Sequence, residues 1–269
     1  MRSTLRPLLS LMVTVLLTLL PRVVQAQAPQ VFTGTGPDGV ATAIAAFKAA
    51  IGGADNGAFP GSLPTGYRQV TWDDVPDQYA EPNNLPPDFY NTVSPRGLML
   101  NPIGYVGAFQ VSATVPNPTS TPVLFGHADL FTTFSAPRIF SGGSESGPGA
   151  AVRFNVPGAT TAAMVSGFGV VFTDVQIAST ARLILYDADY QPLGTFNAPV
   201  TPDHRNVSFI GVVFPTARIH HVYLFQGTYR GSSSMPEDAS HDLVALDDVV
   251  YGEPQPVPCL LYTSPSPRD

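Results

Sequence analysis

The sequence predicts an all-β protein: a two-sheet antiparallel sandwich, jelly-roll-like, preceded by one amphipathic helix. From Tyr67 onward, about eleven short segments rich in Val, Ile, Phe and Thr alternate with clusters of Pro, Gly, Asn and Asp, which is the pattern of strands and turns. The 28 prolines and 24 glycines supply the breaks between so many strands. No second helical pattern of useful length and no fixed repeat period follow, which disfavours parallel α/β sheets, propellers and solenoids.

Residues 1–28 read as a secretory signal peptide. Arg2 and Arg6 form a positive start, and an apolar stretch follows from Leu8 to Leu20. The letters "VVQAQA" then place small residues where cleavage would occur, after Ala26 or Ala28. The apolar stretch is shorter than the roughly 20 residues that span a bilayer, so a retained anchor is the weaker alternative. We expect export to the extracellular space, the cell surface or the periplasm, without membrane insertion after cleavage.

The N-terminal segment 29–66 holds the one helix, predicted over 38–51. Val40, Ile44, Phe47 and Ile51 follow one another at helical spacing and form a single apolar stripe. Asp38 can cap the start, and the glycines at 52 and 53 can end the helix. The stripe is most simply a packing face, whereas the alanine-rich reverse face could meet a partner.

The β-sandwich domain is predicted over 67–253. Its strands are expected at Arg68–Trp72, Leu98–Leu100, Gly107–Val115, Pro122–Phe125, Ala151–Val156, Ala163–Asp174, Ala181–Tyr186, Gly194–Asn197, Val207–Phe214, Ala217–Gln226 and Leu243–Tyr251. The letters "RLILYDADYQPLGTFNAP" predict a hairpin. The long segment "TWDDVPDQYAEPNNLPPDFYNTVSPRG" is either a binding loop or a segment that wraps the surface without a function.

Residues 254–269 form a proline-rich tail without a strand or helix period. Its last ten letters, "LLYTSPSPRD", resemble a translated sequencing-library adapter, so we treat them as a scar. The single cysteine, Cys259, lies beside them. The body of the protein therefore has no disulfide and no cysteine-based site, and we expect its core, or an ion, to stabilise it.

The charge balance excludes some partners. The chain has 13 Lys and Arg against 20 Asp and Glu, and its two ends carry several of the arginines. Nucleic acid and anionic lipid surfaces need a basic footprint, so neither is an expected partner. An excess of carboxylates can instead recruit divalent cations.

Several stretches together resemble a known group of proteins. They are "WDDVPD", "NNLPPDFYNTVSPRG", "GFGVVFTDV", "LYDADYQPLGTF", "VSFIGVVFP" and "DLVALDDVVYGEP". Together they resemble an uncharacterised family of exported bacterial β-sandwich proteins that often carry a short C-terminal sorting tail of the Pro-Glu-Pro type. The resemblance covers roughly 68–254 and implies a fold and export but no activity. The family pattern has glycine at the position of Asp74, which favours Asp73 as the functional residue of that pair.

The most unusual feature is an acidic doublet, Asp247 and Asp248, inside a run that otherwise suits a buried strand. Because successive side chains of a strand point to opposite faces, one aspartate is expected to face the core. A buried carboxylate must be paired, protonated or coordinated. We therefore predict a structural calcium site at Asp73, Asp247 and Asp248, since calcium prefers carboxylate and carbonyl oxygens. The alternative is a backbone clasp, with one aspartate in solvent and the other accepting backbone N–H bonds in a bulge.

Signatures of catalysis are missing from the sequence, so we assign no catalytic residue. There is no G-x-S-x-G elbow, since "GSESG" has Glu145 at the serine position, and there is no H-E-x-x-H motif or phosphate loop. The five histidines lack metal-ligand spacing, and one of His220 and His221 is expected to be a core or rim histidine. Scattered acids such as Asp73, Asp77, Glu81 and Asp129 give only a weak signal for glycoside hydrolysis.

We expect a non-catalytic, exported binding module for a polysaccharide or another cell-envelope component. Loop aromatics could stack on sugar rings or could instead plug the ends of the sandwich; they are Tyr79, Phe89, Tyr90 and Tyr229. The rival is a secreted carbohydrate-active hydrolase, and a purely structural surface protein is a third possibility. A shallow aromatic strip would favour sugar binding, whereas a cleft with two carboxylates roughly 5–10 Å apart would favour hydrolysis.

Overall fold

The computed structural model describes residues 28–101, 108–114, 123–144, 147–232, 234 and 236–258. The signal segment through residue 27, Glu145 and the tail from Cys259 onward lie outside these ranges, as do parts of the predicted strands at 107–115 and 122–125. Within the described residues, no helix is long and apolar enough to cross a membrane.

The protein is mostly β, and among the described residues thirteen strands join in one large curled sheet. The main path of the sheet runs β1-β11-β8-β14-β5-β6-β12-β9-β10, and every strand pair in it is antiparallel. The strands of this path are β1 (Gln30–Thr35), β5 (Phe140–Ser144), β6 (Gly147–Phe154), β8 (Gly167–Thr173), β9 (Arg182–Tyr186), β10 (Pro192–Asn197), β11 (Val207–Val213), β12 (His221–Phe225) and β14 (Leu243–Gly252).

Shorter elements join the path or lie beside it. The side strands are β2 (Tyr67–Val70), β3 (Leu98–Asn101), β4 (Ala108–Val111) and β13 (Tyr229–Arg230), of which β13 pairs with β14 in parallel. A separate small ribbon pairs β7 (Ala163–Met164) with β15 (Gln255–Pro256). The helical pieces are α2 (Gly36–Ile51), α3 (Phe89–Thr92), η2 (Asp77–Tyr79) and η3 (Leu124–Gly126). Ordered pairing thus continues past the predicted domain boundary at residue 253.

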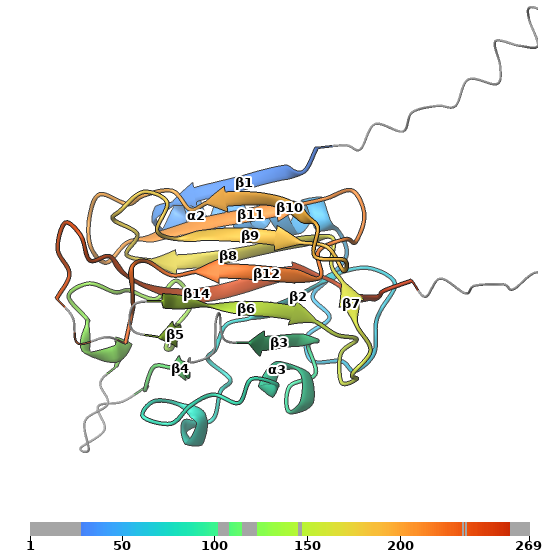
Figure 1. Cartoon of the computed structure of the whole chain (residues 1–269), viewed down its shortest axis with the longest axis horizontal. Coiled ribbons are helices and arrows are strands. Elements are labelled where there is room, and N and C mark those ends of the chain that lie inside the picture. Colours follow the sequence, from blue (N-terminus) through green and yellow to red (C-terminus); the bar gives the residue numbers. More distant parts are fainter. Residues whose placement is uncertain are drawn as a thin grey trace, which may run out of the picture.

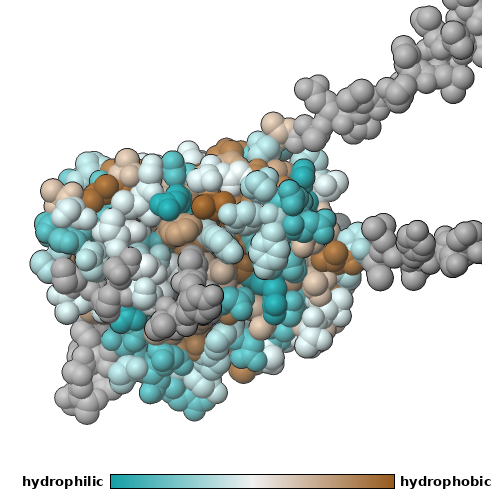
Figure 2. Space-filling view, in the orientation of Figure 1, coloured by the Kyte–Doolittle hydropathy of each residue, from teal (hydrophilic) through white to brown (hydrophobic). Residues whose placement is uncertain are grey.

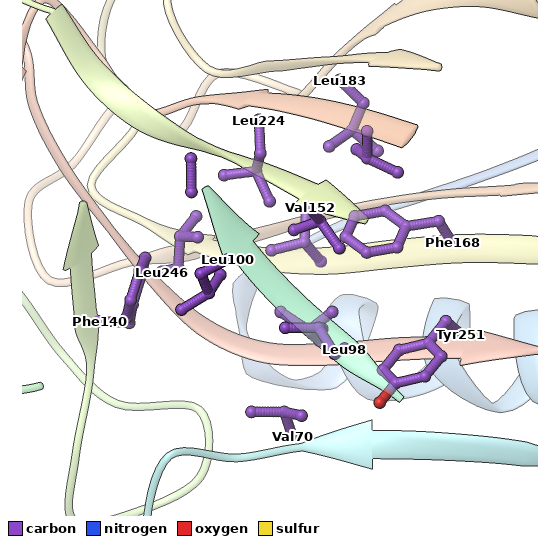
Figure 3. Close-up of a cluster of buried hydrophobic side chains, with 14 of the residues drawn as sticks. Val70, Leu98, Leu100, Phe140, Val152, Phe168, Leu183, Leu224, Leu246 and Tyr251 are labelled. Atoms are coloured by element: carbon purple, nitrogen blue, oxygen red, sulfur yellow. The ribbon is translucent and has the colours of Figure 1, made fainter. Parts of the chain in front are cut away.

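The main core fills the space inside the curl. Alternate apolar residues of β8, β11 and β14 contact those of β3, β6, β9 and β12 in one buried cluster. Figure 3 shows Phe168 and Tyr251 from the first group beside Leu98, Val152 and Leu224 from the second. In Figure 1 the strands β10, β9, β12 and β6 run in front, and α2 lies behind the sheet. Burial of this cluster is the main source of stability, at about 25 cal/mol per Å² of apolar surface.

The helix α2 covers the other face of β11, β8 and β1. Its buried residues are Val40, Ala43, Ile44 and Phe47, and they pack on Val171 and Phe209 of the sheet. The helix begins at Gly36 rather than at the predicted Asp38, because Pro37 suits the first turn. Asp38 therefore does not cap the helix but lies in its first turn. There its negative charge interacts favourably with the positive end of the helix dipole. Gly52 ends the helix with a φ of 80°.

Most predicted strands are present, and the differences have local causes. The predicted 163–174 strand is divided into β7 and β8, and the 3-10 helix η3 stands at Leu124–Gly126, where the end of the predicted 122–125 strand was expected. Four strands, β1, β5, β13 and β15, were not predicted, and β15 lies in the tail that was expected to have no strand. Strand β5 contains Gly143, whose φ is 94° and whose Cβ would lie 2.5 Å from the Gly147 carbonyl oxygen. At this close approach the sheet bends between β5 and β6. The glycines that permit the bend make the sequence of β5 resemble a loop.

The long segment after β2 is a wrapping segment that also contributes to the core. Val75, Leu85, Phe89 and Tyr90 are all buried in the main cluster. Glu81 and Leu85 donate backbone N–H bonds to Val111 and Phe109 of β4. The packing fits the sequence alternative of a segment that wraps the sheet better than that of a free binding loop.

Candidate functional site

The acidic doublet lies in a β-bulge. Along β14, Leu246 pairs with Phe172 of β8 and Val249 pairs with Val170, so Asp247 and Asp248 together face the single residue between them. The bulge shifts the alternation: Val244 and Leu246 enter the main core before it, and Val249 and Tyr251 after it. The expectation from strict alternation, that the two aspartates point to opposite faces, is therefore wrong. Both side chains lie on the face of the sheet that α2 covers, opposite the main core, where they contact Phe134 and Ser135.

Hydrogen-bond donors of the neighbouring residues Phe134 and Ser135 contact both aspartates. The backbone N–H of Phe134 donates to Asp247 Oδ2 over 2.5 Å, and Ser135 Oγ donates to Asp247 Oδ1 over 3.0 Å. The same Ser135 Oγ lies 2.5 Å from Asp248 Oδ1. Burial, and then the charge of Asp248, raise the pKa of Asp247 well above its usual value. Burial is also the main cause of the raised pKa of Asp248.

Asp73, the third predicted ligand, lies near the doublet but has its own donor. Its Oδ1 accepts the backbone N–H of Arg138 over 3.0 Å. Its charge adds to the raised pKa of Asp248, so the two carboxylates are within electrostatic reach of each other. Each of the three carboxylates thus contacts a donor among residues 134–138. These contacts fit the accepting part of the clasp alternative, but neither aspartate of the doublet lies in solvent, since Asp247 is 0% and Asp248 8% exposed.

The loop aromatics considered as sugar platforms are mainly packing residues. Phe89 and Tyr90 are almost fully buried, Tyr79 packs against the main cluster, and Tyr229 packs beside Phe131 and Leu243. Tyr90 also donates to Asp74, and burial is the first cause of its raised pKa. Their role fits the alternative in which they plug the protein interior.

A different group of aromatic side chains lies on the outer face of the front strands. It consists of Tyr186, Tyr190, His221, Tyr223 and Phe225, and we call it the aromatic strip. The ring centroids of Tyr186 and Tyr223 are 5.1 Å apart, and Tyr190 stacks on His221 at 4.0 Å. The cross-strand register brings the residues together, because His221 pairs with Tyr186 and Phe225 with Arg182.

The aromatic strip is open to solvent on one side. Tyr190 is 57% exposed, and Tyr186, Tyr223 and Phe225 are half-buried. Arg182 extends over the Phe225 ring at 4.1 Å, and Arg153 of β6 pairs with His221. In Figure 2 this side of the molecule is a mixture of teal and white with scattered brown patches. Sequence reasoning missed the strip because only the alternation of β9 and β12 pointed to it: β9 alone shows one aromatic, β12 shows two, and Tyr190 lies in the turn after β9.

The adjacent histidines have different surroundings. His220 Nδ1 lies 2.6 Å from the Ala163 carbonyl oxygen, as expected of a rim histidine with a satisfied N–H. Burial lowers the pKa of His220. Burial, together with the charges of His220 and Arg153, lowers the pKa of His221 to about 4. His221 is therefore a neutral ring at neutral pH.

The low pKa of His221 predicts acid-sensitive stability. An unfolded histidine titrates near pH 6.5, so the stabilisation is complete above that pH and is lost as the pH falls toward 4. Between pH 6.5 and 4.5 the free energy of unfolding of the parent protein should fall more steeply than that of His221→Gln. The difference in slope corresponds to the uptake of up to one proton on unfolding, or up to about 1.4 kcal/mol per pH unit. Urea unfolding of both proteins at several pH values measures this difference. A difference that is constant with pH would contradict the prediction.

A third cluster was not predicted as a site. One ligand atom of each of Asp174, His204 and Glu237 lies within 4.8 Å of the others. Asp174 is fully buried, and its two carboxylate oxygens lie 3.1 and 3.2 Å from His204 Nδ1. No sequence pattern indicates the cluster, because the three residues are far apart along the chain and have no common spacing.

Two grooves are formed by residues that the structure describes, and each is lined by a single carboxylate. A groove of about 710 Å³ runs between β1 and α2, and a smaller one of about 190 Å³ lies near Pro215 and Glu253. Asp38 is the one carboxylate that lines the first, and Glu253 is the one that lines the second. Glycoside hydrolysis ordinarily uses two carboxylates on either side of the bond.

No protein-family model matches this chain, and the comparison with curated proteins gives no match. Function is therefore inferred from the residues and their geometry.

Proposed function

We propose that the protein is an exported, non-catalytic module that binds a polysaccharide along the aromatic strip. The observation that carries the proposal is the row of Tyr186, Tyr190 and Tyr223 on an open sheet face, 5.1–6.4 Å from ring to ring. The signal peptide predicted from residues 1–28 and the resemblance to exported bacterial β-sandwich proteins support the location. In this proposal the curled sheet is a jelly-roll-like sandwich. Its two layers are the group β8, β11 and β14 and the group β3, β6, β9 and β12, whose apolar side chains share one core.

The chemistry of the strip fits a sugar chain. The apolar faces of tyrosine rings can cover the C–H faces of sugar rings, and the phenol oxygens can bond to hydroxyl groups. Arg153 and Arg182 on the same face add donors for hydroxyl oxygens. An open strip suits the middle of a chain better than a chain end, and the net charge of −7 favours a neutral polysaccharide over an anionic one.

Binding to a panel of neutral polysaccharides, by affinity electrophoresis or a glycan array, tests the proposal. We expect Tyr223→Ala and Tyr190→Ala each to weaken binding by about two- to tenfold, as for the loss of one aromatic contact of about 0.5–1.5 kcal/mol. Phe59→Ala is the matched control, because Phe59 is 59% exposed and lies away from the strip. Equal binding by all variants, or no binding by the parent protein, would overturn the proposal. Release of reducing ends would favour the hydrolase instead.

The acidic doublet has a structural role in this proposal. Asp73, Asp247 and Asp248 hold residues 134–138 against β14 through the contacts described above. A calcium ion bound to the same carboxylates stays a prediction from the sequence, and the metal titration described below also tests it.

A further inference from the structure

Three neighbouring strands bring the ends of distant segments together. Strand β8 is antiparallel to both β11 and β14, so its end meets the start of each of them. Asp174 follows β8 directly, His204 lies shortly before β11, and Glu237 lies in the connection that leads to β14. The resulting cluster is remote in the sequence but compact in space, and it is separate from the aromatic strip.

The buried carboxylate of Asp174 faces two polar side chains: His204, whose Nδ1 lies 3.1 and 3.2 Å from its oxygens, and Glu237, whose carboxyl group is within hydrogen-bond reach. The nitrogen that faces it, Nδ1, also lies 3.0 Å from Gln176 Nε2. Nδ1 carries either one proton, which it would donate to Asp174, or one lone pair, which can accept from Gln176 or bind a cation in place of that contact. With the lone pair present, the Asp174 oxygens and Nδ1 need a cation between them.

Glu237 supplies an independent sign of a missing partner. Its Oε2 accepts the backbone N–H of Leu243 over 3.3 Å, whereas its Oε1 is buried and no described N–H or O–H group donates to it. A buried polar oxygen without a donor is costly. Burial is the first cause that raises the pKa of Glu237 to about 8, and the charge of Asp174 is the second. Burial also raises the pKa of Asp174 to about 6.

We propose that Asp174, His204 and Glu237 bind one divalent transition-metal ion of the zinc class. One imidazole nitrogen with two carboxylates is a donor set that zinc accepts, whereas calcium prefers oxygen ligands alone. Ligand atoms held about 2.0–2.1 Å from a tetrahedral zinc lie about 3.3 Å from each other, close to the observed separation of Nδ1 from the Asp174 oxygens. The His204 side chain is 46% exposed, which leaves a path for the ion and room for a water ligand.

Neighbouring residues would hold these ligands in place. Asp242 accepts the backbone N–H groups of Gln176 over 3.1 Å and of Ile177 over 3.3 Å, and it also accepts from Thr180 Oγ1. Asp242 thus fixes the loop that follows Asp174 while adding negative charge beside the site. That charge favours positive charge at the cluster, and a divalent ion supplies more of it than a shared proton does.

The test uses the untagged mature protein after treatment with a chelator and dialysis. Calorimetric titration with Zn²⁺ is expected to show one ion per chain. Thermal unfolding with Zn²⁺ at about 100 times its dissociation constant should show a midpoint about 5–10 °C higher than with chelator. Mn²⁺, Mg²⁺ and Ca²⁺ are titrated in parallel.

The variants identify the site. His204→Ala and Glu237→Gln should each weaken Zn²⁺ binding by at least about tenfold, which is the size expected when a metal contact is lost. His204→Ala also removes the neighbour of the buried Asp174 carboxylate, so circular dichroism must show that the variant is folded before its Zn²⁺ binding is compared. His241→Ala is the control, because His241 lies on the same loop as Glu237 and its Nδ1 is 2.7 Å from Asp238 Oδ2. The control also shows whether the loss of any histidine weakens Zn²⁺ binding.

Two results would overturn the proposal. One is the absence of saturable Zn²⁺ binding, or Zn²⁺ binding that His204→Ala leaves unchanged, in which case a proton shared by Asp174 and Glu237 accounts for the cluster. The other is stabilisation by Ca²⁺ alone that Asp247→Asn abolishes and His204→Ala does not, which would place the ion at the acidic doublet.

Discussion

Replacing Arg68 with methionine is expected to lower the free energy of unfolding by about 3–5 kcal/mol, the range for breaking one side of a buried ion pair. The Arg68 side chain has no exposed surface, and it forms two bonds to Glu253, of 2.8 and 2.7 Å. Its remaining N–H groups donate to carbonyl oxygens of the connecting segments; these are at Gly57, Phe59, Gly61 and Pro95. The substitution would leave the carboxylate of Glu253 buried without its charge partner.

Equilibrium unfolding in urea, followed by circular dichroism, measures this loss. Asp74→Asn is the control, because the ion pair of Asp74 with Arg96 is partly exposed and should contribute less than about 1 kcal/mol. The double variant Arg68→Met with Glu253→Leu should recover part of the loss, since neither charge is then left alone. A loss below 1 kcal/mol for Arg68→Met would show that the pair is not the main support of this region.

Trp72→Ala is expected to cost about 3–5 kcal/mol, the range for truncating a large aromatic residue in a core. Trp72 is 1% exposed and stacks on Phe140 with ring centroids 4.3 Å apart. Its Nε1 donates to the Asp247 carbonyl oxygen over 2.5 Å, so the ring connects the start of the long wrapping segment to the bulge. Its φ of 67° is in the left-handed region, which costs free energy that the surrounding packing must offset.

Trp72→Phe separates packing from the hydrogen bond. Phenylalanine keeps an aromatic ring but loses the N–H donor, so we expect a smaller loss of about 1–3 kcal/mol. Trp72 is the single tryptophan of the chain, so circular dichroism and not tryptophan fluorescence must follow unfolding. Phe59→Ala again serves as an exposed control. If both Trp72 variants unfold at the same urea concentration as the parent, the proposed connection to the bulge is wrong.

The sequence by itself determined the features that depend on local pattern. Alternating apolar residues and turn residues predict most of the strands, and the spacing of Val40, Ile44 and Phe47 predicts a helix whose buried face carries those side chains. The hairpin of β9 and β10 follows from two strand patterns with a turn between them, and the strands do pair. Such periodicities hold because each side chain's face is fixed by its own backbone conformation.

Tertiary structure alone decided how those elements meet. The bulge in β14 turns Asp247 and Asp248 to one face, although an alternating pattern assigns them to two. The register between β9 and β12 places Tyr186 beside Tyr223, and the order of β11, β8 and β14 places Asp174 beside His204. Register, bulges and strand order depend on partners far away in the chain. A pattern read along one strand carries no record of which strand lies beside it.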